Sequence, residues 1–315
     1  MATTTSITTT YAGQFSGKYI AAALLSAPTL DKEYITIKPN IKYKEVIKKY
    51  SNDNAIFDAS CDFTATSTVT LTETILTPEE FQVNLQLCKK DFRSDWEAIE
   101  MGISVFDNLP ASFTEFMIGQ VAAQVAAQTE TNIWTGSGVP TGQFQSFDSL
   151  FRTAASGVIS GSSGISGASA GAITGSSTVI AALQSVVDLI PTSVYGKEDL
   201  GIYVSTATMK AFQTAVGGGS AFANGYNNQT VIGLKPMDFQ GIPLNHCPGL
   251  KATSVVAAQK SNLFFGTALL SDRNEVKVLD MADLDGSQNV RIIMRYTAGV
   301  AFGFGPDIVY QVSRN

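Results

Sequence analysis

The sequence predicts an α+β fold in which an extended two-stranded excursion, one long helix and a separate α/β block follow one another along 315 residues. Residues 32–72 indicate the excursion, and apolar side chains at spacings of three and four indicate the helix over residues 112–135. Short apolar runs that alternate with amphipathic segments then indicate the α/β block. The last apolar runs return to the sheet of the first half, so we expect the block to be an insertion.

The N-terminal part predicts an arm followed by two strands. Residues 1–31 are rich in Thr, Ala and Ser and cannot bury a core of their own, so we expect them to lie on other structure. Residues 34–50 are compatible with a strand, residues 51–54 supply a turn, and residues 66–72 alternate as a returning strand.

The excursion over residues 32–72 concentrates lysine and isoleucine. Six of the 21 basic residues lie on its outgoing limb: Lys32, Lys38, Lys42, Lys44, Lys48 and Lys49. They form either a solvated face or a charged finger laid over an acidic neighbouring subunit. Because an isolated ribbon is only marginally stable in water, we expect a neighbour to cover its apolar side chains, which are Ile35, Ile37, Ile41, Val46, Ile47 and Phe57.

The next elements are a strand over residues 81–88, a short helix over residues 92–103 and the long helix. Ser112 and Glu115 form a capping box, which satisfies free backbone donors at a helix start. The helix is then about 35 Å long at 1.5 Å per residue. We expect its apolar face to include Phe113, Phe116 and Val121, and Trp134 stands near its end.

Residues 153–177 are a Gly/Ser/Ala-rich loop, and the α/β block follows. It has a helix over residues 177–190, a strand over residues 201–204, a helix that Ser205 caps, and strands over residues 255–257 and 263–265. The run Gly217, Gly218 and Gly219 leaves a flexible loop beyond the second helix. Strands over residues 276–279 and 290–304 close the chain.

Composition excludes some function classes. Charged residues make up only 15%, against about 25% in a typical soluble domain, so we expect much of the surface to face other protein. A net charge of −6 argues against a dedicated nucleic-acid binder, because phosphate affinity comes from Lys and Arg. The chain lacks a secretory signal and a membrane-spanning run, which predicts a protein made in the cytoplasm.

Little in the sequence predicts catalysis or metal binding. Residues 167–171 match the G-x-S-x-G motif around Ser169, but they lie in Gly/Ser repeats and His246 would have to be the base. Cys61, Cys88 and Cys247 have no metal-ligand spacing, and we expect them to be buried thiols, although the strands of Cys61 and Cys88 could lie side by side. Asp280, Asp283 and Asp285 are more typical of an acidic turn than of a cation site. We predict no catalytic, cofactor or metal residues.

The order of these parts resembles the major capsid proteins of tailed bacteriophages, which share the Hong Kong 97 (HK97) fold. The residues that carry the resemblance are the lysine-bearing segment, the helix that ends in Ile133-Trp134-Thr135-Gly136, and the return through Asn262-Leu263-Phe264-Phe265-Gly266-Thr267. The resemblance implies an N-terminal arm (1–31), an extended E-loop hairpin (32–72), a peripheral domain (73–176 and 266–315) with a long spine helix (112–135), and an inserted α/β axial domain (177–265).

The resemblance also implies a function. It implies a non-enzymatic protein that assembles as pentamers and hexamers into the icosahedral shell, or virion capsid, around double-stranded DNA, without sequence-specific binding. Partners would be further copies, a portal, and scaffold or decoration proteins. The E-loop would contact a neighbouring subunit, and Gly217 to Gly219 would lie near a symmetry axis. Many relatives begin with a charged scaffolding segment, and we expect this chain to assemble without one. The alternatives are an encapsulin-type compartment, which has the same fold, and a serine hydrolase that uses Ser169.

Overall fold

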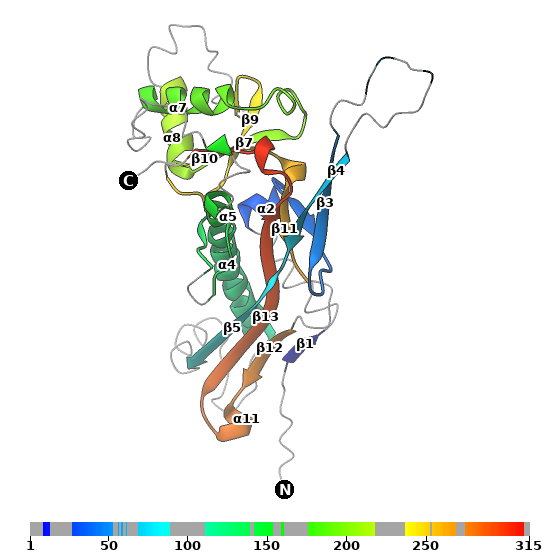
Figure 1. Cartoon of the computed structure of the whole chain (residues 1–315). Coiled ribbons are helices and arrows are strands. Elements are labelled where there is room, and N and C mark those ends of the chain that lie inside the picture. The colour runs from blue at the N-terminus through cyan, green and yellow to red at the C-terminus, as the bar shows by residue number, and fades with distance from the viewer. Residues whose placement is uncertain are drawn as a thin grey trace.

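The computed structural model describes most of the chain, namely residues 9–12, 27–52, 56, 58, 61, 69–88, 111–138, 142–153, 159–160, 176–217, 237–252, 254–268 and 275–311. Its α-helices are α2 (Pro28–Asp31), α4 (Ala111–Thr135), α5 (Phe147–Thr153), α7 (Ser176–Asp188), α8 (Thr206–Gly217) and α11 (Ala282–Asp285). Two 3₁₀ turns are η1 (Lys260–Asn262) and η2 (Gly305–Asp307). Figure 1 shows an elongated molecule, with α4 beside the longest strand and α7 and α8 at one end.

One six-stranded sheet, here called the body sheet, is built around the long strand β13 (Asn289–Phe302). Its order is β1-β12-β13-β11-β2, and β5 also pairs with β13. The other members are β1 (Thr9–Ala12), β2 (Thr36–Lys38), β5 (Glu79–Cys88), β11 (Leu263–Gly266) and β12 (Glu275–Asp280). The side chains of β5 alternate between half-buried and exposed, because one face of this strand packs on the core and the other meets solvent.

The second six-stranded sheet, the α/β sheet, has the order β6-β14-β10-β7-β9-β8. Its strands are β6 (Ile159–Ser160), β7 (Leu200–Val204), β8 (Asp238–Phe239), β9 (Ile242–His246), β10 (Val255–Gln259) and β14 (Val309–Gln311). Every residue of β7, β10 and β14 is buried, as expected of strands covered on both faces. One face packs against α7 and α8, and the other joins the core around α4 and α5.

The third sheet is a two-stranded ribbon, β3 (Glu45–Asn52) and β4 (Val69–Leu76), whose far end projects away from the body (Figure 1). The strands are antiparallel over eight residues each. The expected outgoing strand over residues 34–50 is therefore two strands, β2 and β3. Pro39 lacks a backbone donor and Asn40 has φ of 65°, and these two residues interrupt the strand.

The long helix confirms its prediction closely, since α4 spans Ala111–Thr135. Gly136 ends it where the chain of Phe144 comes close: a Cβ at Gly136 would lie 2.7 Å from the Phe144 carbonyl oxygen. The prediction that Ser205 caps a helix is also confirmed, because its Oγ accepts a hydrogen bond from the backbone N–H of Thr208 at 3.2 Å. The helix predicted over residues 92–103 lies outside the described residues.

The strand memberships of the expected α/β block need correction. Residues 263–265 were assigned to that block, but β11 pairs with β13 and β2 in the body sheet. Conversely, β6 and β14, expected to lie outside the block, belong to the α/β sheet. The physical reason is that η1 separates β10 from β11 and η2 separates β13 from β14, so the chain changes sheets at each short turn.

Candidate functional site

Most large apolar side chains that are exposed within the described ranges lie between residues 43 and 75. In the ribbon, Val46 lies opposite Ile75 and Tyr50 lies opposite Leu71, and directly paired residues share a face of the sheet. Val69 shares that face because it is two residues from Leu71. These five side chains are 45% to 70% exposed. The ribbon thus presents an apolar face to solvent.

A charged pair interrupts this apolar face. Lys48 lies opposite Glu73, between the Val46–Ile75 and Tyr50–Leu71 pairs, and both charged residues are exposed. We call the whole set the open face, defined by Val46, Lys48, Tyr50, Val69, Leu71, Glu73 and Ile75. Exposed aromatic and aliphatic side chains gathered on one face are typical of a surface that contacts other protein.

The opposite face of the ribbon rests on the body at its base. Leu76 is fully buried, in a small cluster with Ile41 and Ala301, and Ile47 packs against this cluster. The Thr74 hydroxyl donates to the carbonyl of Gly303 at 3.3 Å. The base of the ribbon is therefore fixed to its own chain, while the open face is not covered by the described residues.

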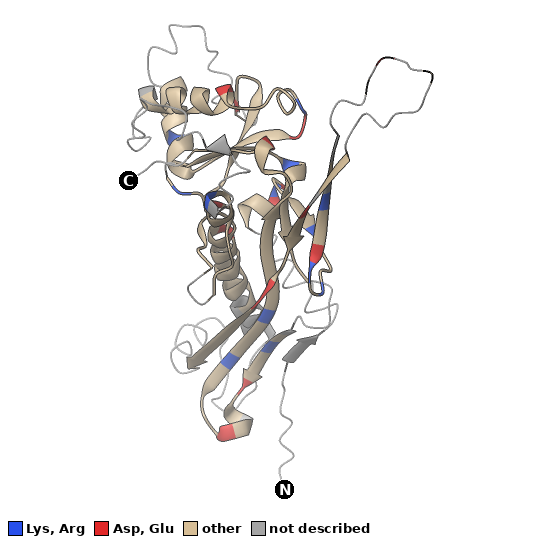
Figure 2. Ribbon diagram, in the orientation of Figure 1, with Lys and Arg blue, Asp and Glu red and all other residues tan. Residues whose placement is uncertain are grey.

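The predicted lysines divide into two groups. Lys38 interacts with its own chain. Its Nζ forms an ion pair with Glu45 Oε1 at 3.0 Å and lies over the Phe264 ring, 5.9 Å from the ring centroid. Lys42, Lys44 and Lys48 are exposed. Figure 2 shows that the basic residues are spread over several elements, including β3, β12 and β13. The side chains of Lys49 and Phe57 lie outside the described residues.

The expectation that Ile37 and Ile41 would need a partner to cover them is wrong. Ile41 is 6% exposed and lies in the cluster beneath the ribbon, and Ile37 packs against the main core. Ile35 is likewise buried, and Ile47 is half-buried against the body. The reason is that residues 35–41 form β2 and its connection, which lie in the body sheet. Of the isoleucines and valine expected to face a partner, only Val46 is exposed.

The remaining predicted residues lie on two helices. Val121 of α4 is buried in the main core, as predicted, and Trp134 at the end of the helix is buried there too. The side chains of Phe113 and Phe116 lie outside the described residues. Gly217 ends α8, and Gly218 and Gly219 lie outside the described residues.

Beneath the α/β sheet, Glu130 of α4 forms a buried polar junction with α2. Its carboxylate accepts hydrogen bonds from the Thr29 backbone N–H (2.9 Å) and the Thr29 hydroxyl (2.6 Å). The Trp134 indole N–H donates to the same hydroxyl at 2.9 Å. Burial raises the pKa of Glu130, and hydrogen bonds from Thr29 and Gly249 oppose this rise. In the described part of the chain, no lysine or arginine forms an ion pair with Glu130.

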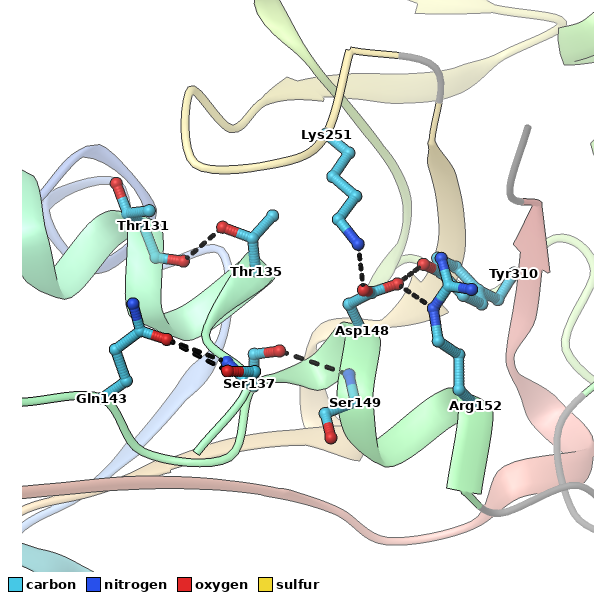
Figure 3. Close-up of polar contacts among 10 residues, drawn as sticks. Thr131, Thr135, Ser137, Gln143, Asp148, Ser149, Arg152, Lys251 and Tyr310 are labelled. Atoms are coloured by element: carbon cyan, nitrogen blue, oxygen red, sulfur yellow. Dashed lines mark hydrogen bonds and ion pairs between the residues drawn. The ribbon is translucent and has the colours of Figure 1, made fainter. Parts of the chain in front are cut away.

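A second carboxylate, Asp148 of α5, forms a charged junction (Figure 3). Lys251 Nζ lies 2.6 Å from Asp148 Oδ2, and Arg152 Nε lies 2.8 Å from Oδ1. The Tyr310 hydroxyl of β14 donates to Oδ1. Three elements, α5, β14 and the loop that carries Lys251, therefore meet at one side chain.

The catalytic alternative gains no support from the described residues. His246 Nε2 lies 2.9 Å from the Thr206 hydroxyl, and burial, followed by the charge of Lys32, lowers the pKa of His246. Ser169 lies outside the described residues. Cys247 is fully buried, and burial raises the pKa of its thiol well above the ordinary value, which favours the neutral thiol over the thiolate.

The other cysteines and the acidic residues have ordinary positions. Cys61 is exposed, contrary to expectation, and Cys88 is half-buried opposite Asn289. The acidic segment connects β12 to β13, as predicted, and its middle forms the short helix α11; before this helix, Asp280 Oδ1 accepts a hydrogen bond from the Ala282 N–H at 3.0 Å. Within the described ranges no three His, Cys, Asp or Glu side chains are grouped to bind a metal ion. No described helix is long and apolar enough to span a membrane.

Sequence reasoning missed most of the open face. The alternation of Val69, Leu71, Glu73 and Ile75 with threonine was a usable signal, because it places these four side chains on one face of a strand. This alternation does not reveal the register in which β4 pairs with β3. Glu130 and Asp148 could not be identified as junctions from sequence, because Thr29, Lys251 and Tyr310 are about 100 residues or more away and only Arg152, four residues from Asp148, is local.

The structure resembles chains of solved phage capsids, whereas no family model and no curated protein matches the sequence. A capsid chain of the native GTA particle has a TM-score of 0.54 and 11% identity, with 99% of this chain and 94% of that chain covered. A chain of the satellite phage P4 procapsid structure has a TM-score of 0.52 and 10% identity, with coverage of 94% and 97%. A capsid chain of cyanophage P-SCSP1u has a TM-score of 0.53 and 11% identity, with coverage of 90% and 88%.

These likenesses confirm the predicted fold class at the level of a mixed α and β fold shared with phage capsid chains. They extend over nearly the whole chain and nearly the whole of each compared chain. At 10–11% identity the likeness shows the fold alone.

Proposed function

We propose that this chain is the major capsid protein of a tailed phage, which assembles into an icosahedral shell around double-stranded DNA. The observation that carries the proposal is that a capsid fold accounts for nearly the whole chain, with no described part left over for another activity. The charge balance agrees, because a shell that encloses DNA needs no strong affinity for phosphate. The protein would be a structural component of the virion and not an enzyme.

Within this proposal, the ribbon β3–β4 is the E-loop, and its open face lies against a neighbouring subunit. Five exposed apolar side chains on one face are unfavourable in a monomer, and burial of apolar surface contributes roughly 25 cal/mol per Å². The occupant we propose is a second copy of this chain. Lys48 and Glu73 would then direct the register by pairing with charges of that copy.

The other parts take the remaining roles of a capsid subunit. Helix α4 would be the spine helix, the body sheet the peripheral domain, and the α/β sheet with α7 and α8 the axial domain. Relative to the boundaries expected from sequence, β11 moves to the peripheral domain, and β6 and β14 move to the axial domain. Gly217 to Gly219 would lie near the five-fold and six-fold axes, and a portal and a scaffold or decoration protein would be further partners.

The test is whether the chain forms shells. We expect closed particles with pentameric and hexameric units when the protein, expressed with any scaffold from its own genome, is sedimented and imaged by negative-stain electron microscopy. Particles from the natural host should contain nuclease-protected genomic DNA. A chain that stays as free subunits under both conditions contradicts the proposal, and shells that hold an enzyme cargo but no genome would favour the encapsulin alternative.

A further inference from the structure

The body and the α/β sheet share one hydrophobic core. Along β7, β10 and β14, alternate side chains point to opposite faces, and one set joins the core that contains Trp134 and Phe151. The ring centroids of Trp134 and Tyr203 are 5.4 Å apart, and those of Phe151 and Tyr310 are 5.3 Å apart. Interlocked aromatic rings of this kind resist sliding of the two parts past each other.

Residues 247–252, between β9 and β10, lie at this boundary, and we call them the junction loop. Gly249 lies directly against α4: a Cβ there would be 2.1 Å from the Glu130 carbonyl oxygen. Leu250 is buried in the shared core. At the other end of the loop, the Ala252 carbonyl accepts hydrogen bonds from the hydroxyls of Ser205 (2.9 Å) and Thr208 (3.2 Å).

Charged contacts hold the junction loop at a second point. Lys251 pairs with Asp148, which also binds Tyr310 of the α/β sheet and Arg152 of its own helix (Figure 3). The side chain of Asp148 is only 11% exposed, so removing its partners would leave a nearly buried charge. The loop is thus held by a steric fit at Gly249, by the burial of Leu250, by the ion pair of Lys251 and by the hydrogen bonds to the Ala252 carbonyl, and these contacts together resist rotation of the loop.

We infer that the junction loop is a rigid joint, which makes the body and the α/β sheet one piece with a fixed angle between them. Gly249 lets the junction loop approach α4 closely, and the ion pair between Lys251 and Asp148 fixes the junction loop relative to α5. In the shell, and therefore resting on the proposed function, every copy would keep this angle. Differences between five-fold and six-fold environments would then be taken up outside the joint.

The inference can be tested on the free subunit by pulsed electron spin resonance. Spin labels would be attached at Gln124→Cys on α4 and Lys210→Cys on α8, both exposed, in a background with Cys61 and Cys88 replaced by serine. Cys247 is fully buried and stays. We expect one narrow distance peak. Gly249→Ala and Asp148→Asn should each broaden or shift it, because the added methyl group pushes the loop away from α4 and the lost charge releases Lys251.

The matched control is Glu33→Gln, which removes an exposed ion pair with Lys260 outside the joint and should leave the peak unchanged. If Gly249→Ala does not fold, Asp148→Asn and Lys251→Met carry the test. A broad or double peak in the unmodified protein, or a narrow peak that survives all joint variants, overturns the inference. A narrow peak in a subunit that never assembles would contradict the proposed function and leave the joint standing.

Discussion

At the scale of single residues, Glu130 has the most unusual environment in the described chain. Its side chain is buried beside the thiol of Cys247. One carboxylate oxygen accepts a hydrogen bond from the Thr29 backbone N–H, and the other accepts one from the Thr29 hydroxyl. Thr29 is in the first turn of α2, where backbone N–H groups have no partner within the helix, so Glu130 acts as a cap supplied by another helix. One side chain thereby ties α2 to α4.

This environment predicts a pH dependence of stability. Burial raises the pKa of Glu130 above its ordinary value of 4.5, so the folded state holds the proton more tightly than the unfolded state does. The stabilising contribution is therefore complete below pH 4.5 and is lost as the pH rises through the raised pKa. Urea unfolding at a series of pH values should show that Glu130→Gln removes this part of the dependence. A variant whose free energy of unfolding changes with pH as the unmodified protein's does would contradict this assignment.

At the scale of elements, α4 and the ribbon differ in where their apolar side chains lie. Helix α4 buries Val121, Val125 and Ile133 and exposes Gln124 and Gln128 on its other side. The ribbon buries only its base and exposes its apolar face. The first pattern stabilises a subunit, and the second stabilises contact between subunits.

The buried face of α4 can be tested by introducing a charge on its buried side and, as a control, on its exposed side. Val121→Asp places an unpaired carboxylate in the core, which costs several kcal/mol, and should abolish soluble folded protein. Gln124→Asp, three residues away on the exposed side, is the control and should fold normally. The measurement is soluble yield with circular dichroism. Equal yields would show that the buried face of α4 is misplaced. The same loss is predicted for Phe116→Asp.

The open face of the ribbon can be tested with matched leucines. Leu71 is 70% exposed on the open face, and Leu284 is 65% exposed on the short helix α11 between β12 and β13. Leu71→Asp should leave the subunit folded and reduce the yield of shells strongly, because the partner would have to bury an unpaired charge. Leu284→Asp should leave assembly unchanged. Similar shell yields for the two variants in sedimentation would argue against the open face as an interface.

Lys48 of the ribbon, and Lys42 and Lys44 in the segment before it, should contribute to assembly through their charge. Joint reversal of Lys42, Lys44 and Lys48 to Glu should leave the monomer folded and lower the shell yield, most clearly at low salt. Exposed ion pairs are worth about 0.2–1 kcal/mol each and are screened by salt, so the deficit should shrink as salt is added. Light scattering during assembly at two ionic strengths would measure it. Full assembly of the variant at low ionic strength would indicate a merely solvated face.

At the scale of the whole molecule, the parts that could be predicted are those with a local signal. Helix α4 and most of strand β5 follow from the periodicity of their apolar residues, and the cap at Ser205 follows from its neighbours. Sheet membership could not be read, because an apolar run such as Leu263–Gly266 fits either sheet. The burial of Ile41 depends on Leu76 and Ala301, which are far away in sequence. The open face needed the register of β3 with β4, which is equally non-local.

The central claim is that the open face lies on a neighbouring copy in a closed shell, and a cryo-electron microscopy reconstruction of assembled particles tests it most directly. The account predicts capsomers in which Tyr50, Leu71 and Ile75 of each copy are buried against the next subunit. It also predicts that the angle between the body and the α/β sheet is the same in every copy. Particles in which the open face stays in solvent, or in which the ribbon folds back over its own body, would contradict it.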